Sequence, residues 1–345
     1  YKAGILLGLG LYILGALLFY PAKFTANFYN FLAALWILSG GLSILETAAN
    51  PYIIAMGPEE TGTRRLNFAL SFNPLGSIAG VILSKLFILS HLNSADASER
   101  AAMSTRELQA IQAGELDAVT TTYVVVGLIL LITWILIALN KSMPKASDTS
   151  GPLNLVPTFK RLIHNQHYMW GVVAQFFYVG AQIGVWSFTI RYVMQELNLN
   201  EASASSYYIA ALILFTASRF ICTWLMKYIS PGNLLAILSG LAIVFSLMVI
   251  FAGGYPGVYA LVGISGCMSL MFPTIFGLAV KGLGEDNKLG GSGIIMAILG
   301  GAVITQIQGI VSDAAQSINL AYFVPLSCFV IIAYYGAVAS QKDLP

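Results

Sequence analysis

A carboxylate and an amide, Glu46 and Asn50, stand four residues apart in a long apolar stretch, and Pro51 follows directly. Residues four apart share one face of a helix, and a proline frees a backbone carbonyl in the preceding turn to accept another hydrogen bond. Glu46 is the one acidic residue deep inside an apolar stretch, where an ionised group costs roughly several kcal/mol. We therefore predict that Glu46 binds and releases a proton and that Asn50 lines a polar pocket; the alternative is a protonated Glu46 bonded to a neighbouring helix.

A second set of polar and aromatic residues follows one face of a later helix, at spacings of three, four and four: Gln175, Tyr178, Gln182 and Trp186. Aromatic rings stack on the apolar side of a sugar ring, and amides reach its hydroxyl groups. We predict that these residues line a cavity for a small polar ligand. For Trp186, a place in the aromatic belt at the membrane boundary stays open.

Two further polar residues lie inside apolar stretches. Asn73 precedes Pro74, and its amide suits a sugar hydroxyl, although membrane asparagines also bond helices to one another. Arg219 keeps its charge and needs a carboxylate, carbonyls or water. Glu46 is one candidate partner for Arg219, and a structural clamp on helix ends is the other.

The composition places these residues in a membrane protein. Hydrophobic residues make up 57% of the 345, charged residues only 9%, and the mean hydropathy is +0.79. A membrane-spanning helix needs about 20 apolar residues. Ten stretches meet this length and predict an all-α integral membrane bundle: 3–21, 28–55, 68–91, 122–140, 169–192, 207–228, 232–252, 257–280, 291–312 and 319–340.

Basic residues set the orientation. With linker 141–168 in the cytoplasm, the cytoplasmic ends of the helices hold Lys2, Arg64, Arg65, Lys141, Lys145, Lys160, Arg161, Lys227, Lys281, Lys288 and Lys342. The opposite ends hold only Lys23, Arg100, Arg106 and Arg191, with Lys85 inside a span. This distribution follows the positive-inside rule. Val156–Tyr168 in this linker predicts a basic amphipathic segment on the membrane surface.

The linker divides the chain into residues 1–140, with four spans, and residues 169–345, with six. Many transporters consist of two six-helix halves joined by a cytoplasmic loop. We therefore expect a fragment that lacks its first two helices; a ten-helix protein is the alternative. Two mid-membrane breaks are predicted later, at Pro273 and across the glycine-rich stretch 290–301, which either forms a flexible gate or lets helices approach closely.

The sequence lacks the residue patterns of nucleotide-driven transporters, metalloproteins and enzymes. The sequence has no nucleotide-binding phosphate loop, and its three cysteines and three histidines show no metal-ligand spacing. It offers no paired carboxylates or Ser–His arrangement for an enzyme. We expect no enzyme activity, no cofactor, no metal and no nucleic-acid partner.

Several motifs resemble the fucose permease branch of the major facilitator superfamily across nearly the whole chain. They include Leu-Glu-Thr-Ala-Ala-Asn-Pro at 45–51, Phe-Asn at 72–73, Tyr-Val-Gly-Ala-Gln at 178–182, Trp-Ser at 186–187, Ile-Arg-Tyr at 190–192, Ser-Arg-Phe at 218–220 and Pro-Thr-Ile-Phe at 273–276.

This resemblance implies twelve helices in two halves and proton-coupled import of L-fucose, or a related hexose, by alternating access across the bacterial inner membrane. It places Glu46 at the family's buried glutamate, and it places Asn73, Gln182, Trp186 and Phe215 at cavity positions.

The resemblance has two departures. The chain carries Leu70 where relatives often have Gln and Phe272 where they often have Tyr, so each position loses a hydrogen-bonding group. We also expect Phe272 to line the sugar cavity, and Arg191 and Arg219 to act as structural or gating charges. The expected partners are a sugar, a proton and the lipid bilayer, with the protein a monomer; a glucose/galactose transporter and a non-transporting sugar sensor are the alternatives.

Overall fold

The structure is a computed structural model that describes residues 1–25, 27–83, 87–88, 100, 103–140 and 155–342. Within these ranges, nine helices are long and apolar enough to cross a membrane. The tenth predicted span, 68–91, is divided between two shorter helices, α3 (Gly62–Leu70) and α4 (Asn73–Leu83), and several of its later residues lie outside the described ranges. Lys85, His91, Lys141 and Lys145 also lie outside them.

The chain forms two compact units. Unit 1 contains Tyr1–Tyr52 and Leu75–Lys145, and unit 2 contains Ile53–Pro74 and Ala146–Pro345. The segment 53–74 thus groups with the C-terminal part of the chain, although the sequence places it in the predicted domain 1–140.

Contacts of α3, and of Glu59 in the turn just before it, explain this grouping. The Asn67 amide donates to the Thr274 hydroxyl at 3.2 Å, and the Glu59 carboxylate accepts from the Gly282 backbone N–H at 2.7 Å. A Cβ on Gly277 would lie 2.6 Å from the Thr63 hydroxyl oxygen, so α3 packs closely against the helix that carries Gly277. Both hydrogen bonds and packing therefore hold α3 in unit 2.

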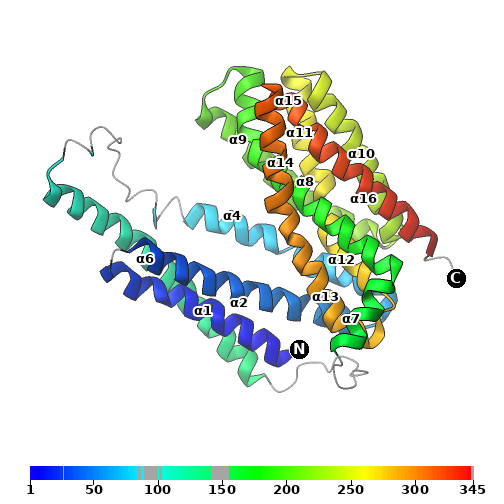
Figure 1. Cartoon of the computed structure of the whole chain (residues 1–345), viewed down its shortest axis with the longest axis horizontal. Helices are drawn as coiled ribbons and strands as arrows, with labels where there is room; N and C mark the ends of the chain where they lie inside the picture. The colour runs from blue at the N-terminus through cyan, green and yellow to red at the C-terminus, as the bar shows by residue number, and fades with distance from the viewer. Residues whose placement is uncertain (26, 84–86, 89–99, 101–102, 141–154, 343–345) are drawn as a thin grey trace. The chain divides into compact units, whose positions relative to one another are not determined.

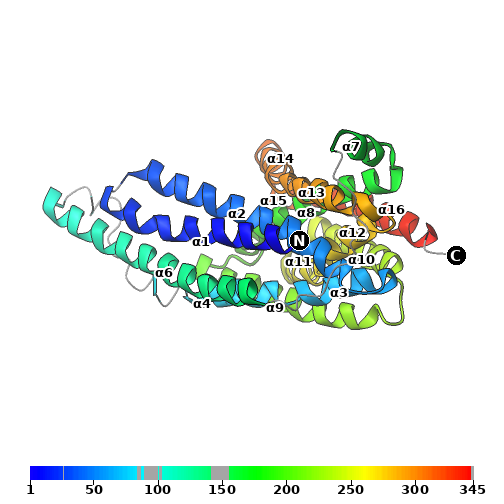
Figure 2. The ribbon, with the colours of Figure 1, turned by 90° about the horizontal axis from the view of Figure 1, so that it is seen from below.

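Unit 1 contains α1 (Lys2–Thr25), most of α2 (Phe28–Ala55), most of α4 and all of α6 (Thr105–Leu139). Helices α1 and α6 lie side by side (Figures 1 and 2). Helices α1 and α2 touch through glycines: a Cβ on Gly41 would lie 2.4 Å from the Tyr12 backbone nitrogen, and one on Gly15 would lie 2.5 Å from that of Leu38. Small residues permit this close approach of membrane helices.

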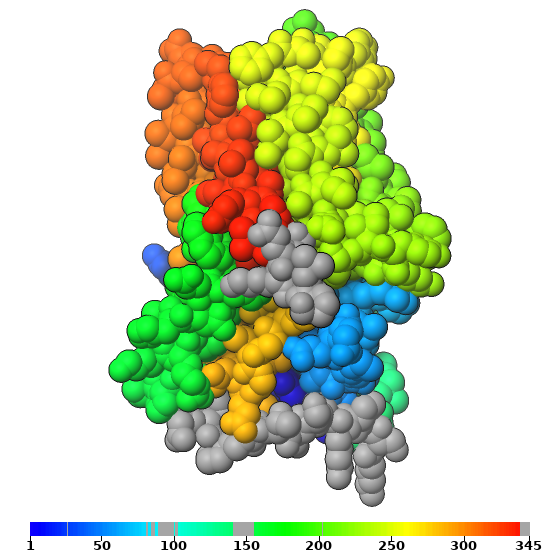
Figure 3. All heavy atoms as spheres, turned by 90° about the vertical axis from the view of Figure 1, so that its right-hand side faces the viewer, coloured from blue at the N-terminus to red at the C-terminus, as the bar shows by residue number. Residues whose placement is uncertain are grey.

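Unit 2 is arranged around the long helix α8 (Gln166–Leu197), which contacts helices before and after it. The remaining helices are α7 (Leu155–His164), α9 (Glu201–Leu225), α10 (Pro231–Phe251), α11 (Gly254–Met268), α12 (Met271–Val280), α13 (Asn287–Met296), α14 (Gly300–Ala315), α15 (Ile318–Ala321) and α16 (Phe323–Lys342). Short 3₁₀ turns η1 (Glu59–Thr61), η4 (Gly284–Asp286) and η5 (Ala297–Leu299) join some of them. Figure 3 shows α16 between α14 and α10 on one face.

Helix α7 has the amphipathic character predicted for the segment after the linker. Thr158 and Leu162 are buried, whereas Val156 and Phe159 are exposed. Arg161 forms an ion pair with Asp286, with Nε 2.8 Å from a carboxylate oxygen, and this hydrogen bonding raises the pKa of Arg161 above its usual value. The exposed apolar face suits a membrane surface.

The two predicted mid-membrane breaks are present. Helices α11 and α12 are separated at Ser269 and Leu270, ahead of Pro273, and α13 and α14 are separated by η5. Glycines permit close packing of α14 against α8 just after the second break: a Cβ on Gly300 of α14 would meet the Phe176 carbonyl oxygen, and one on Gly180 of α8 would lie 2.5 Å from the Ile304 side chain. Of the two interpretations of the glycine-rich stretch, close approach of helices therefore describes Gly300.

We predict that Gly300→Ala lowers the stability of the protein by about 1–3 kcal/mol, because the new methyl group meets a backbone oxygen that cannot move alone. The measurement is the midpoint of thermal unfolding in detergent. Gly240→Ala is the matched control, since nothing lies within 4 Å of a Cβ at that position. Equal midpoints for the two variants would contradict the packing described here.

Candidate functional site

Arg219 holds two broken helices of unit 2 together. Its Nη1 donates to the Leu70 carbonyl at 3.0 Å, and its Nε donates to the Ser269 carbonyl. The residue is only 5% exposed, and its guanidinium carbon lies 4.5 Å from the centre of the Phe215 ring, which adds a cation–π contact. Of the two interpretations given by the sequence, these contacts favour the structural clamp.

Each of these two carbonyls lacks its usual helical donor, because the residue four positions later is a proline. In an α-helix, the carbonyl of residue i accepts from the N–H of residue i+4, and proline has no N–H. Leu70 precedes Pro74 by four residues, and Ser269 precedes Pro273 by four. Arg219 therefore replaces the hydrogen bonds missing at the α3–α4 break and at the α11–α12 break.

The predicted cavity residues Trp186 and Phe215 meet beside this clamp. Their ring centres are 5.1 Å apart in an edge-to-face arrangement, and the Trp186 indole N–H donates to the Ser265 hydroxyl at 3.3 Å. Trp186 is partly exposed and Phe215 is buried. Because the same Phe215 ring contacts Arg219, the aromatic pair and the charged clamp form one continuous cluster on α8, α9 and α11.

Tyr178 and Phe272 extend the cluster along α8 and α12. The Tyr178 hydroxyl donates to the Met268 carbonyl at 3.1 Å, next to the helix break, and its ring centre lies 6.3 Å from that of Phe272. Tyr178 is completely buried, whereas Phe272 is partly exposed. In this structure, the Tyr178 hydroxyl is occupied by the backbone, so Phe272 is the better placed of the two to face a ligand.

The two glutamines predicted on the same face of α8 have different surroundings. Gln182 is partly exposed, and among the described residues no hydrogen bond holds its amide. Gln175 is completely buried, and neither amide atom has a hydrogen-bond partner in the described part of the chain. Gln308 on α14 is also completely buried, and neither of its amide atoms has a hydrogen-bond partner among the described residues.

Asn73 and Arg191 are both exposed. Asn73 is the first residue of α4. It lies three residues after Leu70, whose carbonyl accepts a hydrogen bond from Arg219. Arg191 lies in the later part of α8, five residues beyond Trp186. The structure therefore brings Asn73 close in the chain to the clamp and leaves Arg191 outside the aromatic cluster.

Glu46 and Asn50 lie in unit 1, on one continuous helix. Helix α2 runs through Pro51 without a break, so the two side chains keep the predicted spacing of one turn. Asn50 is 3% exposed, and its side-chain N–H₂ group has no partner among the described residues; Glu46 is partly exposed. Pro51 cannot donate to the Thr47 carbonyl, which leaves an acceptor beside the carboxylate.

Comparison with known proteins adds independent findings. The sequence pattern of the Major Facilitator Superfamily matches residues 1–306. The chain is 42% identical to the L-fucose-proton symporter of Haemophilus influenzae over 97% of this chain and 81% of that protein. It is 32% identical to the glucose/galactose transporter of Brucella abortus, over 99% of this chain and 79% of the relative.

A solved structure is similar as well. The crystal structure of the transporter FucP in the outward conformation superimposes with a TM-score of 0.93 at 39% identity. The match covers 99% of this chain and 83% of that chain.

We predict that Arg219→Met lowers stability by about 2–4 kcal/mol, because two buried carbonyls lose a charged donor. In a Pro273→Ala background, residue 273 regains an N–H for the Ser269 carbonyl. The cost of Arg219→Met should then fall by about 1 kcal/mol. Thermal unfolding of the four proteins in this double-mutant cycle measures the difference, and strictly additive effects would show that the proline and the arginine do not share an acceptor.

Proposed function

This chain belongs to the Major Facilitator Superfamily, and within it we propose a proton-coupled symporter that imports L-fucose by alternating access. The high identity to L-fucose-proton symporters over nearly the whole chain carries this conclusion. The chain is a transporter and not an enzyme, and the co-transported proton takes the place of a cofactor.

Glu46 is the group that we propose for proton coupling. It is the only acidic residue deep in an apolar span of the sequence. On the same helix, Thr47 follows it directly and Asn50 lies one turn further along. The carboxyl group would be neutral when sugar is bound and ionised after the proton leaves. Linkage requires that a proton on Glu46 and a bound sugar each strengthen the binding of the other.

For the sugar, we propose that the cluster of unit 2 contributes one wall of the binding site. Trp186 is fixed by Ser265 and Phe215, so its indole can offer a rigid face to the apolar side of a sugar ring. Gln182 supplies a polar amide on the same helix, and Asn73 and Phe272 lie near the two helix breaks. Gln175 and Tyr178 are buried behind this wall, where their proposed role is to support it.

A glucose/galactose transporter is the second candidate, because a relative of that function is 32% identical. Leu70 and Phe272 lack polar side-chain groups, so they do not add hydrogen bonds that would select one hexose. A sugar sensor without transport is the third candidate. Counterflow of labelled L-fucose in proteoliposomes, with unlabelled D-glucose and D-galactose as competitors, separates the three: a sensor shows no flux, and a glucose/galactose transporter is inhibited most by those sugars.

The protein is a multi-pass membrane transporter, and we propose that it lies in the bacterial inner membrane. We further propose that the linker 141–168 faces the cytoplasm and that the protein acts as a monomer. The excess of basic residues at the helix ends on the linker side supports this orientation.

We predict that Glu46→Gln keeps sugar exchange within about twofold and reduces proton-driven net uptake roughly tenfold or more, because a neutral amide cannot release a proton. The measurements are counterflow and sugar-induced alkalinisation in vesicles made with the complete protein. Normal alkalinisation by the variant would remove Glu46 from the coupling mechanism.

We also predict that Gln182→Leu weakens L-fucose binding about five- to tenfold, since one hydrogen bond to a hydroxyl group is lost. Isothermal titration of the purified protein gives the dissociation constant. Gln306→Leu on α14 is the matched control, because Gln306 is exposed and belongs to no part of the proposed site. A similar change in both variants would argue against a contact between Gln182 and sugar.

A further inference from the structure

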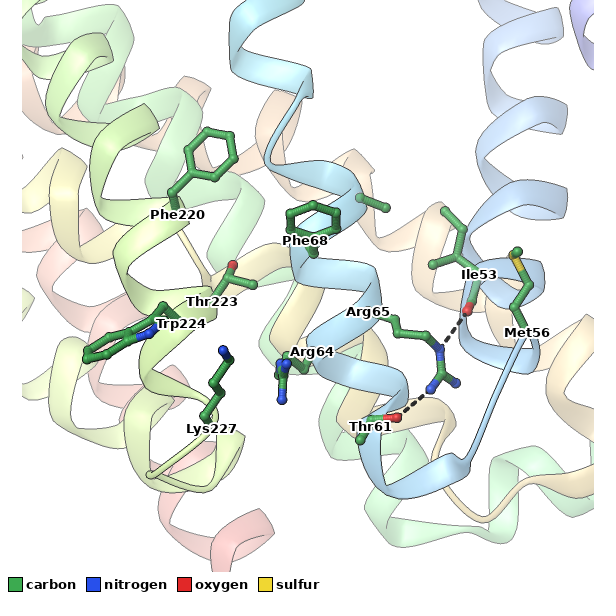
Figure 4. A pocket seen from close by; sticks show the side chains of 11 residues that line it. Ile53, Met56, Thr61, Arg64, Arg65, Phe68, Phe220, Thr223, Trp224 and Lys227 are labelled. Atoms are coloured by element: carbon green, nitrogen blue, oxygen red, sulfur yellow. Dashed lines mark hydrogen bonds between the residues drawn. The ribbon is translucent and has the colours of Figure 1, made fainter.

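A second feature of unit 2 plays no part in the proposed transport of sugar: a pocket of about 800 Å³ between α3 and α9. Its lining residues come from the end of α2, the following turn, α3, α9 and the turn after α9 (Figure 4): Ile53, Met56, Thr61, Arg64, Arg65, Phe68, Ala69, Phe220, Thr223, Trp224 and Lys227. Three of them are basic and none is acidic. The pocket therefore combines concentrated positive charge with apolar walls.

The Arg65 guanidinium forms hydrogen bonds within the protein. Its guanidinium donates to the backbone carbonyls of Ile53, Ile54 and Pro58, and to the Thr61 hydroxyl. These bonds satisfy carbonyls at the C-terminal end of α2, where a positive charge is favourable. Burial lowers the pKa of Arg65 from its usual value. Four of the five N–H groups of Arg65 are thus used within the protein, so Arg65 shapes the pocket and has at most one donor left for a ligand.

Arg64 and Lys227 have no such partners. Among the described residues, neither forms an ion pair or a side-chain hydrogen bond. Figure 4 shows both side chains directed into the space between α3 and α9. The nearby carboxylate of Glu59 accepts from the Gly282 N–H and is not among the groups that line the pocket. Two cations therefore face one pocket, and no anion from the described part of the chain balances them.

Half of the apolar residues that line the pocket are aromatic: Phe68, Phe220 and Trp224. Phe68 and Trp224 are 55% and 53% exposed, although both are large apolar side chains. Phe72 joins α3 to α9, with its ring centre 5.6 Å from that of Phe68 and 5.9 Å from that of Phe220. Lys227 lies two residues past the end of the candidate span Ser203–Leu225, so the charged end of the pocket is at a membrane boundary.

We propose that this basic pocket binds an anionic phospholipid, with the headgroup phosphate at Arg64 and Lys227 and an acyl chain against Phe68, Phe220 and Trp224. Basic pockets between membrane helices recognise anionic headgroups, and exposed aromatic rings at the boundary suit acyl chains. A lipid whose headgroup also carries an ammonium group fits less well, because that group would meet two uncompensated cations.

The test is native mass spectrometry of the detergent-purified complete protein with added phosphatidylglycerol. We expect phosphatidylglycerol to remain bound and phosphatidylcholine to bind more weakly. The Arg64→Gln/Lys227→Gln variant should lose affinity for phosphatidylglycerol roughly 10- to 30-fold, since each cation near a membrane surface contributes about fivefold. Trp224→Ala, which keeps both charges, should also weaken binding of this lipid.

A matched control variant distinguishes a specific lipid site from a general effect of positive surface charge. Lys160→Gln/Arg106→Gln removes the same charge from exposed positions outside the pocket and should leave the affinity within about twofold. An equal loss in this control, or unchanged affinity in the pocket variant, would overturn the proposal. Binding of glycerol phosphate or inorganic phosphate as strong as that of the lipid would show a soluble anion to be the ligand and would also overturn it.

Folding of the variants is read from cooperative thermal unfolding, which does not depend on transport. Should the double variant fail to fold, Lys227→Gln alone serves, because Lys227 is exposed and lies after the end of α9. It should reduce affinity for phosphatidylglycerol about fivefold. No reduction in that variant would count against the site, and the outcome is independent of which sugar the protein carries.

Discussion

The interaction on which unit 2 depends is the double hydrogen bond from Arg219 to the Leu70 and Ser269 carbonyls. Backbone groups inside a membrane must find partners within the protein, and prolines at 74 and 273 deny two carbonyls their usual ones. A single planar cation with several donors can satisfy both at once, which a lysine cannot do as well. Phe215 lies against the same guanidinium, so the clamp also fixes one side of the aromatic pair formed with Trp186.

Much of this arrangement could be predicted from local sequence, because membrane helices are defined by length, apolar content and proline position. The helical class and the breaks near Pro273 and within 290–301 followed from these signals, and a proline four residues beyond a carbonyl marks that carbonyl in any sequence. Which donor reaches it is a tertiary question. From the sequence, the partner of Arg219 could be either the Glu46 carboxylate or backbone carbonyls at helix ends. The packing of α3 against α9 and α12 brings the Leu70 carbonyl to Arg219.

Helical periodicity predicts which residues of the site share a helix face, but it does not predict which of them are buried. It places Gln175, Tyr178, Gln182 and Trp186 on one face of α8, yet burial differs sharply along that face. The neighbours α11, α12 and α14 decide which turns stay open, and these neighbours lie about a hundred residues away in the chain. The basic pocket could not be predicted for the same reason, because its residues come from separate helices and share no local pattern.

The glycine contacts between α8 and α14 have a practical consequence for measuring motion. Gly300 on α14 lies against the Phe176 backbone of α8, and Gly180 on α8 lies against the Ile304 side chain of α14, so sliding or tilting of this helix pair leads to steric overlap. Spectroscopic labels attached to the outer faces of these two helices should keep a constant separation while other parts of the protein change position. The pair offers an internal ruler against which displacements during a transport cycle can be calibrated.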